Sequence, residues 1–447
     1  MSQTATASNT AIVILAAGKG TRMQSALPKV LHEVAGRPML GHVIAASLEA
    51  GVSRLCLVTA PDQQQVRDYA LTQAPDISNC IQESQLGTGD AARAAIPALD
   101  TAERVVIMFG DTPLMRADIL RQLATSEADV CVLGFEPEDA AAYGRIILDQ
   151  GTPARIVEYK DADAATRAIG LCNGGAMGVS IAALIELLPQ LQNDNAQGEY
   201  YLPDLVQLAK AAGRTTELVR GDSDDTLGVD SRKGLARAEA RMQARLRAKM
   251  LDAGVGMQDP DTVYLSHDTE IAADVTLEPH IKIGPGVHIG TGTLIKAFSH
   301  LEGVRIGARA TIGPFARLRP GTVLGDEVRI GNFVETKKAH LGDGSKVNHL
   351  SYIGDAELGV GVNVGAGTIT CNYDGFKKHV TRIGDGAFIG SNSSLIAPVT
   401  IGAGAYLGSG TAVSGEVSAD SLAVTRAPRR DIEGWAQSFR RKNQEAD

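Results

Sequence analysis

The sequence lacks the excess of positive charge that a nucleic-acid-binding protein needs. Its 43 Lys and Arg residues are outnumbered by 52 Asp and Glu residues, so the formal net charge is -9. Neutralising a phosphate backbone takes many basic side chains. We therefore expect no nucleic-acid partner, although local basic groups can still hold small anions.

Signals for export and membrane insertion are also missing. No apolar run approaches the roughly 20 residues of a membrane-spanning helix, and the polar stretch Met1–Thr10 has no basic region of the kind that opens a secretory signal. We expect a cytoplasmic protein with small-molecule substrates, no stable membrane insertion and a mobile tail over residues 1–10.

Cysteine is scarce, and its spacing is uninformative. The five cysteines are Cys56, Cys80, Cys131, Cys172 and Cys371. Their number is odd, they are scattered, and no two form a CxxC pair, so neither a disulfide framework nor a zinc site is indicated. This pattern favours a reducing compartment.

The length and composition predict more than one domain. A chain of 447 residues is too long for one compact core, and with 21% charged residues it is too apolar for disorder. We expect two domains, over residues 11–232 and 254–447, joined by a helix over residues 233–253.

The N-terminal half alternates short apolar runs with amphipathic segments. The clearest strands and helices are Ala11–Leu15, Arg54–Val58, Arg104–Phe109, and then Met39–Ala50 and Gln63–Leu71. Continuous apolar strands are buried on both faces, which is typical of a mostly parallel α/β sheet with crossover helices.

The stretch Ser231–Ala253 has the pattern of one long helix. Met242, Leu246 and Met250 recur at four-residue intervals along one side of it. This favours a solvated connecting helix with a thin apolar stripe, and a nucleic-acid-binding arm is the alternative.

Beyond Tyr264 an aliphatic residue followed by glycine recurs every six residues. The pairs begin at Ile283, Ile289, Ile306, Ile312, Leu324, Ile330, Leu341, Ile353, Val364, Ile383, Ile389, Ile401 and Leu407. This period is the signature of a hexapeptide β-helix, in which each unit forms one side of a triangular coil and the aliphatic residue points inward. The frame breaks between Val364 and Ile383, where Gly367–His379 is expected to form a loop outside the coil.

A glycine-rich turn, Leu15–Met23, follows the first strand, and Lys29 comes shortly after it. Backbone N–H groups of such a turn can approach phosphate oxygens, and Arg22 and Lys29 supply positive charge. The turn lacks the third glycine of a dinucleotide fingerprint and the Lys-Ser/Thr ending of a P-loop. It is predicted to be a phosphate-binding loop of another kind.

Two further markers follow in the same domain. One is the polar, glycine-rich stretch Gln82–Gly89, and the other is Phe109–Leu114, in which a buried strand ends near Asp111. An acidic residue at the carboxyl end of a central strand lies beside the ligand crevice of an α/β sheet. Asp111 is therefore predicted to hold Mg²⁺ against a triphosphate.

Together these three markers resemble the sugar-nucleotide pyrophosphorylase family. With the hexapeptide repeats, nearly all of the chain beyond the tail resembles the bacterial bifunctional N-acetylglucosamine-1-phosphate uridylyltransferases/glucosamine-1-phosphate N-acetyltransferases. The resemblance implies a Rossmann-like nucleotidyltransferase domain, a linker helix and a left-handed parallel β-helix. It also implies acetyl transfer from acetyl-CoA to glucosamine 1-phosphate, then Mg²⁺-dependent uridylyl transfer from UTP with release of pyrophosphate. The product, UDP-N-acetylglucosamine, would serve cell-wall and envelope glycans.

The resemblance implies a set of residues for uridylyl transfer. Arg22 and Lys29 would be catalytic, and Asp111 and Asp230 would bind the metal. The UTP and UDP-sugar site would comprise Leu15, Ala16, Ala17, Gly18, Lys29, Gln82, Gly87, Thr88, Phe109, Gly110, Asp111, Gly144, Glu158, Asn173 and Asp230.

Three positions depart from the usual family residues: Asp230 stands where Asn is usual, Asp90 where His is common, and Phe109 where Tyr is common. A carboxylate is a stronger Mg²⁺ ligand than an amide, so the metal role of Asp230 is kept. Asp90 and Phe109 could alter the pocket near the base or the sugar.

Acetyl transfer to an amine needs a general base, and a histidine side chain ordinarily titrates near neutral pH. Taken alone, His349 would more often be an ordinary surface residue, but the resemblance places the catalytic histidine in its motif, Lys346–Tyr352. The glucosamine-phosphate site would comprise Arg319, Lys337, Tyr352 and Asn363. The acetyl-CoA site would comprise Ala366, Asn372, Tyr373, Ser391, Ser409 and Arg426.

Triangular coils usually pack three around an axis, so we expect a homotrimer with acetyl-transfer sites at subunit clefts. Two other interpretations remain open at this point. The β-helix could be a regulatory domain on a single nucleotidyltransferase, as in ADP-glucose pyrophosphorylases, or it could serve only for trimerisation or binding. The full-length coil, His349 and the Asn372-Tyr373 loop argue against the first, and failure to release free thiol from acetyl-CoA with any amino sugar phosphate would favour the second.

Overall fold

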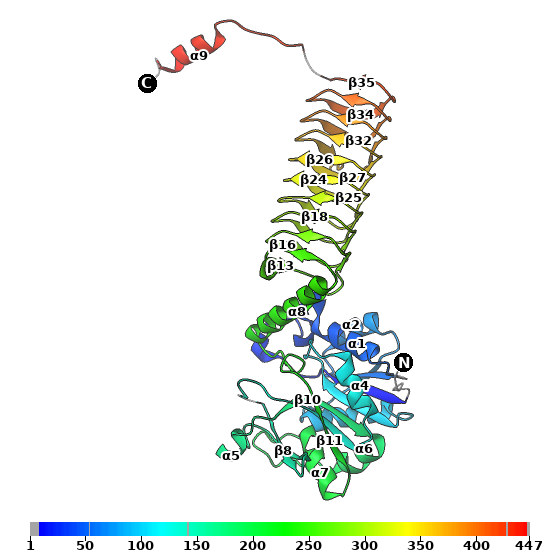
Figure 1. Ribbon diagram of the computed structural model, residues 1–447, viewed down its shortest axis with the longest axis vertical. Coiled ribbons are helices and arrows are strands. Elements are labelled where there is room, and N and C mark those ends of the chain that lie inside the picture. Colours follow the sequence, from blue (N-terminus) through cyan, green and yellow to red (C-terminus); the bar gives the residue numbers. More distant parts are fainter. Residues whose placement is uncertain (1–8, 53, 141–142, 426–427, 445–447) are drawn as a thin grey trace. The chain divides into compact units, whose positions relative to one another are not determined.

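The structure is a computed structural model that describes residues 9–52, 54–140, 143–425 and 428–444 (Figure 1). The chain divides into two compact units, one ending at Arg245 and the other beginning at Leu246. None of the described helices combines the length and apolar character that crossing a bilayer requires. The predicted mobile tail lies almost entirely outside the described ranges, and Thr10 already belongs to the first strand.

The first unit contains one main sheet. Its strands are β1 (Thr10–Leu15), β4 (Arg54–Thr59), β5 (Ser78–Ile81), β6 (Arg104–Phe109), β7 (Val130–Phe135), β8 (Arg145–Asp149), β9 (Thr152–Val157), β10 (Cys172–Ser180) and β11 (Thr216–Arg220). The order along the sheet is β11-β7-β10-β6-β1-β4-β5, with β8 and β9 as a hairpin beside β10. β10 is antiparallel to both neighbours, and the other pairs along the path are parallel. The predicted α/β class and its mostly parallel sheet are confirmed.

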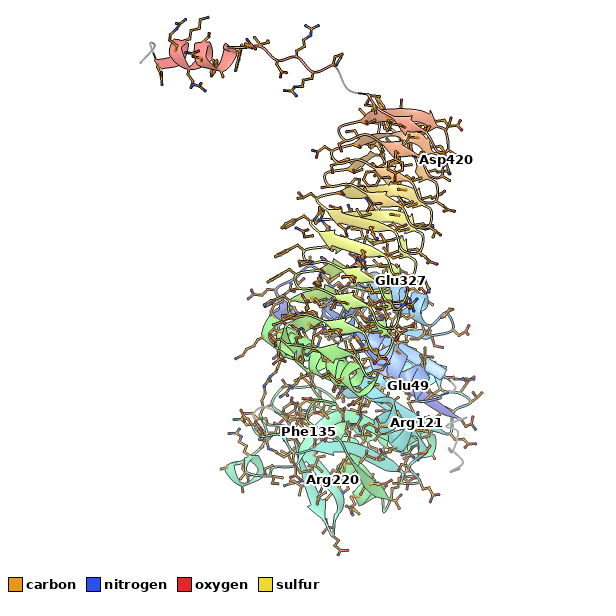
Figure 2. All side chains as sticks on the ribbon, turned by 45° about the horizontal axis from the view of Figure 1, so that its top comes forward. Glu49, Arg121, Phe135, Arg220, Glu327 and Asp420 are labelled. Carbon is orange, nitrogen blue, oxygen red and sulfur yellow. The ribbon has the colours of Figure 1, made fainter. Side chains whose placement is uncertain are left out.

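Helices cover both faces of this sheet. They are α1 (Met39–Glu49), α2 (Gln64–Gln73), α3 (Thr88–Ala95), α4 (Ala117–Thr125), α5 (Ala164–Arg167), α6 (Ile181–Leu187) and α7 (Leu205–Ala211). α1, α2 and α4 pack on one face, and α3, α6 and α7 pack on the other. Every residue of β1 is buried, with Ile12 facing the first set of helices and Val13 facing the second, as expected for a central strand. Arg121 of α4 donates a hydrogen bond of 3.1 Å to the carbonyl of Glu49 at the end of α1 (Figure 2).

Short elements connect these strands and helices. They are η1 (Thr21–Met23), η2 (Lys29–Leu31), β2 (Glu33–Val34), β3 (Arg37–Pro38), η3 (Ile96–Ala98), η4 (Leu188–Gln190) and η5 (Leu202–Asp204). The predicted strands and helices of this unit agree with β1, β4, β6, α1 and α2 to within two residues at each end.

The predicted long helix is α8 (Arg232–Asp252), which contains the boundary between the two units. Its apolar stripe is more deeply buried than that of a solvated connector. Met242 is 7% exposed, and Met250 is 5% exposed and belongs to the core of the second unit. Within the first unit, the Glu239 carboxylate accepts a 2.7 Å hydrogen bond from the backbone N–H of Ala35.

The second unit is a stack of short parallel strands (Figure 1). One sheet runs β12-β15-β18-β21-β24-β26-β28-β31-β33-β35. Its members are β12 (Gly256–Met257), β15 (Thr276–Leu277), β18 (Leu294–Ile295), β21 (Thr311–Ile312), β24 (Arg329–Asn332), β26 (Lys346–His349), β28 (Asn363–Val364), β31 (Phe388–Ile389), β33 (Tyr406–Leu407) and β35 (Leu422–Ala423).

The remaining strands form the other sides of the coil. They are β13 (Val263–Tyr264), β14 (Glu270–Ile271), β16 (Ile281–Ile283), β17 (His288–Ile289), β19 (His300–Leu301), β20 (Val304–Ile306), β22 (Arg317–Leu318), β23 (Thr322–Leu324), β25 (Glu335–Leu341), β27 (Tyr352–Leu358), β29 (Ile369–Cys371), β30 (Thr381–Ile383), β32 (Ser394–Ile401) and β34 (Ala412–Val417). The helical elements η6 (Pro260–Thr262) and α9 (Trp435–Gln444) complete the unit.

The six-residue period places one aliphatic residue of each coil above the next. A continuous buried column follows the pairing register Ile295, Ile312, Ile330, Val347, Val364, Ile389 and Leu407. Most steps in this column are 17 or 18 residues, which is three hexapeptides per turn of the coil. No single repeat could bury such a column alone, so the stack itself forms the core.

The break in the repeat is smaller than the sequence indicated. The prediction that all of Gly367–His379 leaves the coil is wrong, because β29 (Ile369–Cys371) pairs with β27 and β32. Thr368 and Thr370 are buried there in place of aliphatic residues, and their hydroxyls donate to the backbone carbonyls of Gly365 and Gly354 at 2.8 Å and 3.1 Å. Satisfied threonines can therefore continue the coil, and the excursion begins only after them.

Candidate active sites

The turn after β1 is closed tightly against Lys29. Gly20 has a φ of +60°, and a Cβ built on it would lie 2.6 Å from the Cβ of Lys29. Ala16 N–H donates to the carbonyl of Val58 at 2.8 Å, which fixes the start of the turn on β4. Gly20 is thus required both for its left-handed backbone and for the close approach of Lys29.

Two ion pairs bring the predicted phosphate and metal residues together. The ammonium of Lys29 contacts the carboxylate of Asp111, and both side chains are largely buried. The guanidinium of Arg22 lies 2.6 Å from the carboxylate of Asp230. A backbone hydrogen bond of 2.9 Å from Val229 N–H to the Asp111 carbonyl joins the two segments. Two cations and two carboxylates therefore meet at the carboxyl end of β6.

The donor set fits Mg²⁺, which binds proteins through one or two carboxylates and takes its other ligands from water and substrate phosphates. Asp111 and Asp230 supply two carboxylates. Within the described part of the chain no three His, Cys, Asp or Glu side chains form a metal-binding group. Such a pair suits an ion that arrives with a nucleotide better than an all-protein metal cage.

Gln82 is held rigidly beside this turn. It is 5% exposed, and its amide donates to the Asp90 carboxylate at 2.7 Å and to the Gly87 carbonyl at 3.1 Å. Gly87 has a φ of +110°, and a Cβ on it would lie 2.7 Å from the carbonyl oxygen of Tyr200. The hydroxyl of Thr88 accepts from Leu202 N–H at 2.9 Å. The unusual residue Asp90 thus orients the Gln82 amide, a role that sequence reasoning did not find.

The predicted sugar residues meet on the β8–β10 side of the sheet. Asn173 N–H donates to the carbonyl of Gly144 at 2.8 Å, and a Cβ on Gly144 would lie 3.0 Å from a carboxylate oxygen of Glu158. Burial, followed by the nearby carboxylates of Asp161 and Asp204, raises the pKa of Glu158.

The remaining predicted residues of this site line the end of β1. Leu15, Ala16 and Ala17 are buried, whereas Gly18 is exposed, and Gly110 N–H donates to the Leu15 carbonyl at 2.9 Å. The ring of Phe109 lies next to Gly175, where a Cβ would be 2.8 Å from the ring. Gly175 was not predicted, although a glycine pair after Asn173 was a signal for a close approach.

In the second unit, His349 is exposed at the end of β26. Its Nδ1 lies 3.0 Å from the amide oxygen of Asn332, which occupies the paired position one coil earlier. When Nδ1–H donates to that oxygen, Nε2 carries the lone pair and can accept a proton. Asn332 was not predicted from the sequence, although it lies 17 residues before His349, a spacing of one turn of the coil.

Three cations lie together near this histidine's coil. The ammonium of Lys378, followed by the guanidinium of Arg319, lowers the pKa of Lys337. Arg319 also contacts Glu335 at 2.7 Å. Such a concentration of positive charge is typical of a phosphate site. Lys378, which lies in the excursion after β29, was not predicted.

The excursion is anchored by Asn372. This residue is 8% exposed, and its amide donates to the Asp355 carboxylate and, at 3.4 Å, to the hydroxyl of Tyr352. The neighbouring Tyr373 is exposed and donates to the carbonyl of Gly375 at 2.6 Å. Asn372 and Tyr352, predicted for different substrates, are therefore in contact.

The other predicted acetyl-CoA residues follow one line along the coil. Ala366, Ser391 and Ser409 each come directly after the glycine of an aliphatic-glycine pair. A Cβ on Gly365 would lie 2.5 Å from the nitrogen of Ser391, and one on Gly390 would lie 2.4 Å from that of Ser409. These small residues therefore stack coil upon coil.

Asn363 pairs in register with Lys346, in the strand of His349. Arg426 lies outside the described residues.

Two family models match the chain. Residues 12–194 match the MobA-like NTP transferase domain, and residues 303–338 and 381–415 match the bacterial transferase hexapeptide of six repeats. The fold and these matches define a two-domain transferase, in which a Rossmann-like nucleotidyltransferase domain is joined to a left-handed parallel β-helix of hexapeptide repeats.

Similar proteins match almost from end to end. The bifunctional protein GlmU of Azorhizobium caulinodans is 48% identical over 96% of this chain and 97% of its own length. The GlmU proteins of Sphingopyxis alaskensis and Xanthobacter autotrophicus are 48% and 49% identical, each over 96% of this chain and over 96% and 97% of their own. A solved UDP-glucose pyrophosphorylase complexed with UDP-glucose is 19% identical, with a TM-score of 0.44 over 53% of this chain and 99% of that one, and supports no further argument.

The chain belongs to the GlmU family of bifunctional proteins. It is an enzyme with two activities, which acetylates glucosamine 1-phosphate and then transfers a uridylyl group to N-acetylglucosamine 1-phosphate to give UDP-N-acetylglucosamine.

Proposed function

We propose that the ion-paired cluster of the first unit is the uridylyl-transfer site. A phosphate oxygen of the sugar 1-phosphate attacks the α-phosphorus of UTP, and pyrophosphate leaves. Mg²⁺ held by Asp111 and Asp230 would supply positive charge against the triphosphate. Arg22 and Lys29, released from their carboxylate partners, would contact the phosphates and stabilise the charge that builds up during transfer.

The nucleotide and sugar assignments belong to the same proposal. Leu15 to Gly18, Gln82, Gly87 and Thr88 would contact the uridine, and Gly144, Glu158 and Asn173 would contact the sugar. Phe109 and Gly110 would belong to the same UTP and UDP-sugar site. The fixed Gln82 amide supports this, because an oriented donor and acceptor can recognise a base edge without first losing side-chain entropy.

For acetyl transfer, His349 is the proposed general base. Its Nε2 would take a proton from the amine of glucosamine 1-phosphate as the nitrogen attacks the thioester carbonyl, and the thiol of CoA leaves. Arg319, Lys337 and Lys378 would hold the phosphate, with Tyr352 and Asn363 against the amino sugar. The acetyl-CoA groove would be lined by Ala366, Asn372, Tyr373, Ser391, Ser409 and Arg426.

The chief support for this proposal is that the two units hold separate sets of reactive groups. The histidine oriented by Asn332 and the three cations belong to the second unit, whereas both carboxylate-cation pairs belong to the first. Each half-reaction therefore has its own set of groups.

Two variants test the assignment, and each serves as the control for the other. His349→Ala should lower the release of free thiol from acetyl-CoA at least about 100-fold, the usual worth of a general base, and leave pyrophosphate release from UTP and N-acetylglucosamine 1-phosphate unchanged. Asp111→Ala should have the opposite effect and should raise the Mg²⁺ concentration that uridylyl transfer needs. A loss of both activities in either variant would contradict the separation.

We further propose a cytoplasmic homotrimer, with domains over residues 11–232 and 254–447. Exposed aromatic rings support self-association: Phe298, Phe315 and Phe333 stack at 4.9 Å and 5.3 Å along one corner of the coil, and each is about half exposed. A continuous apolar edge of this kind favours coverage by protein. Light scattering should give three times the 46.8 kDa of one chain, about 140 kDa.

A further inference from the structure

Two of the five cysteines, far apart in the sequence, lie side by side in the first unit. The sulfur atoms of Cys56 and Cys80 are 3.1 Å apart. Cys56 is on β4 and Cys80 on β5, and the parallel register sets Cys80 opposite Val58. Because side chains two residues apart in a strand share a face, Cys56 and Cys80 are diagonal neighbours on the same face of the sheet.

The two thiols differ in their access to solvent. Cys56 is 2% exposed and belongs to the core beneath α3. Cys80 is half-buried on β5, the last strand of the sheet path. Cys80 is therefore the more accessible of the two residues, and Cys56 lies in the core.

The same hydrogen bond makes the thiols chemically unequal. It lowers the pKa of Cys80 to about 7. The bond to Cys80, followed by burial, raises the pKa of Cys56. The thiol of the less buried residue, Cys80, is thus the one that forms a thiolate, which is the nucleophilic species. A partly accessible thiolate with a second thiol beside it is the arrangement found in redox-sensing cysteines.

We propose that Cys56 and Cys80 form a reversible disulfide when the protein meets a peroxide. The thiolate of Cys80 attacks one peroxide oxygen, so an S–O bond forms, the O–O bond breaks, and water leaves after protonation. The sulfur of Cys56 then attacks the sulfenic acid of Cys80, losing its proton, and the S–O bond breaks to release a second water. Two thiols are oxidised and one peroxide is reduced, and a dithiol reverses the change by exchange.

The cross-link would act on the nucleotide site, a consequence that rests on the proposed function. Closing the sulfurs from 3.1 Å to the roughly 2 Å of a disulfide draws β5 and β4 together beneath α3. Cys80 is two residues before Gln82, whose N–H donates to the Thr59 carbonyl at the end of β4. α3 begins at Thr88, so the segments that carry Gln82, Gly87 and Thr88 all border the pair.

The first experiment asks whether the bond forms. The full-length protein is treated with hydrogen peroxide under native conditions, remaining thiols are alkylated, and the digest is mapped without reduction. We expect a peptide joining Cys56 to Cys80, loss of two of the five thiols, and full recovery with dithiothreitol. Cys371→Ser, in the other unit, should give the same linked peptide. If Cys56 and Cys80 remain open to alkylation after peroxide, the proposal is overturned.

A variant separates the two chemical steps. In Cys56→Ser the sulfenic acid of Cys80 has no partner, so a sulfenic-acid reagent should label Cys80 several-fold more strongly than in the unsubstituted protein. Equal labelling in the two proteins would show that Cys56 does not attack Cys80, and it would overturn the mechanism without depending on the stability of the oxidised form.

The last measurement concerns function. Oxidation should lower uridylyl transfer at least about threefold, dithiothreitol should restore it, and acetyl transfer by the same sample should not change. If the linked peptide forms and the rate does not change, the regulatory consequence is overturned. Absence of uridylyl transfer in the reduced protein would instead refute the proposed function, so the two failures are distinguishable.

Discussion

At the scale of single residues, the phosphate turn depends on the close contact between Gly20 and Lys29. Gly20→Ala should lower uridylyl transfer at least about tenfold, because the new methyl would displace Lys29 in addition to the roughly 1–2 kcal/mol of a left-handed alanine. Gly51→Ala is the matched control, since Gly51 also has a positive φ, +79°, but has open space around it. Initial rates of pyrophosphate release would decide, and equal losses in both variants would contradict the steric argument.

The acidic residues around Glu158 should make the first unit sensitive to pH. Burial, followed by the carboxylates of Asp161 and Asp194, raises the pKa of Asp204 to about 6. The folded state then binds this proton more tightly than the unfolded state does. The protonated Asp204 carboxyl therefore contributes fully to stability below the ordinary carboxyl pKa of about 4, and this contribution is lost as the pH rises through 6.

Asp204→Asn removes the buried carboxyl group, and with it the cost of ionising that group in the folded state. At pH 8 it should raise the free energy of unfolding by about 1–2 kcal/mol after allowance for solvent screening, and the gain should shrink as the pH is lowered from 6 toward 4.5. Calorimetry would measure the unfolding of the first unit, whose transition is identified as the one whose midpoint temperature rises when UTP is added. Asp149→Asn, at an exposed position, should change stability by no more than about 0.5 kcal/mol at either pH. A gain independent of pH would refute the linkage.

At the scale of elements, most of what could be predicted came from the periodic pattern of the sequence. The aliphatic-glycine repeat predicted that Ile312, Ile330 and Val364 point inward, and all three are buried. The period could not show that Thr368 and Thr370 would stay in the coil, because their hydroxyls also donate to the carbonyls of Gly390 and Gly354 in neighbouring coils. Nor could it show that β10 runs antiparallel, since strand direction is set by how the chain crosses the sheet.

One buried valine tests how the coil supports its site. Val347 is fully buried two residues before His349, whereas Val360 is 54% exposed. Val347→Ala should cost the second unit about 2 kcal/mol through lost burial and the cavity left behind. Acetyl transfer should fall with it, because β26 positions His349 against Asn332.

Val360→Ala removes the same atoms from an exposed position and should cost under about 0.5 kcal/mol. Denaturant unfolding monitored through the single tryptophan, Trp435, or through circular dichroism would compare the two. Similar losses from both variants would show that the aliphatic column does not carry the stability of the coil.

At the scale of the whole molecule, contacts between residues far apart in the chain could not be predicted from the sequence. Lys337 and Lys378 are 41 positions apart, and Cys56 and Cys80 are 24 apart. Their proximity follows from the strand register and from the path of the excursion after β29, and neither has a local pattern. The family motifs could name Arg22, Lys29 and Asp111, yet they could not indicate that these cations and carboxylates are paired with one another.

The two units have separate cores and separate sets of reactive groups, so their reactions should work in separate molecules. A mixture of His349→Ala and Asp111→Ala proteins, given glucosamine 1-phosphate, acetyl-CoA, UTP and Mg²⁺, should make UDP-N-acetylglucosamine although neither variant does so alone. Product should appear after a lag, because N-acetylglucosamine 1-phosphate must first accumulate in solution. Raising the amount of the Asp111→Ala protein should shorten that lag. If the mixture made no product while each variant kept its remaining half-reaction, the intermediate would have to pass within one assembly.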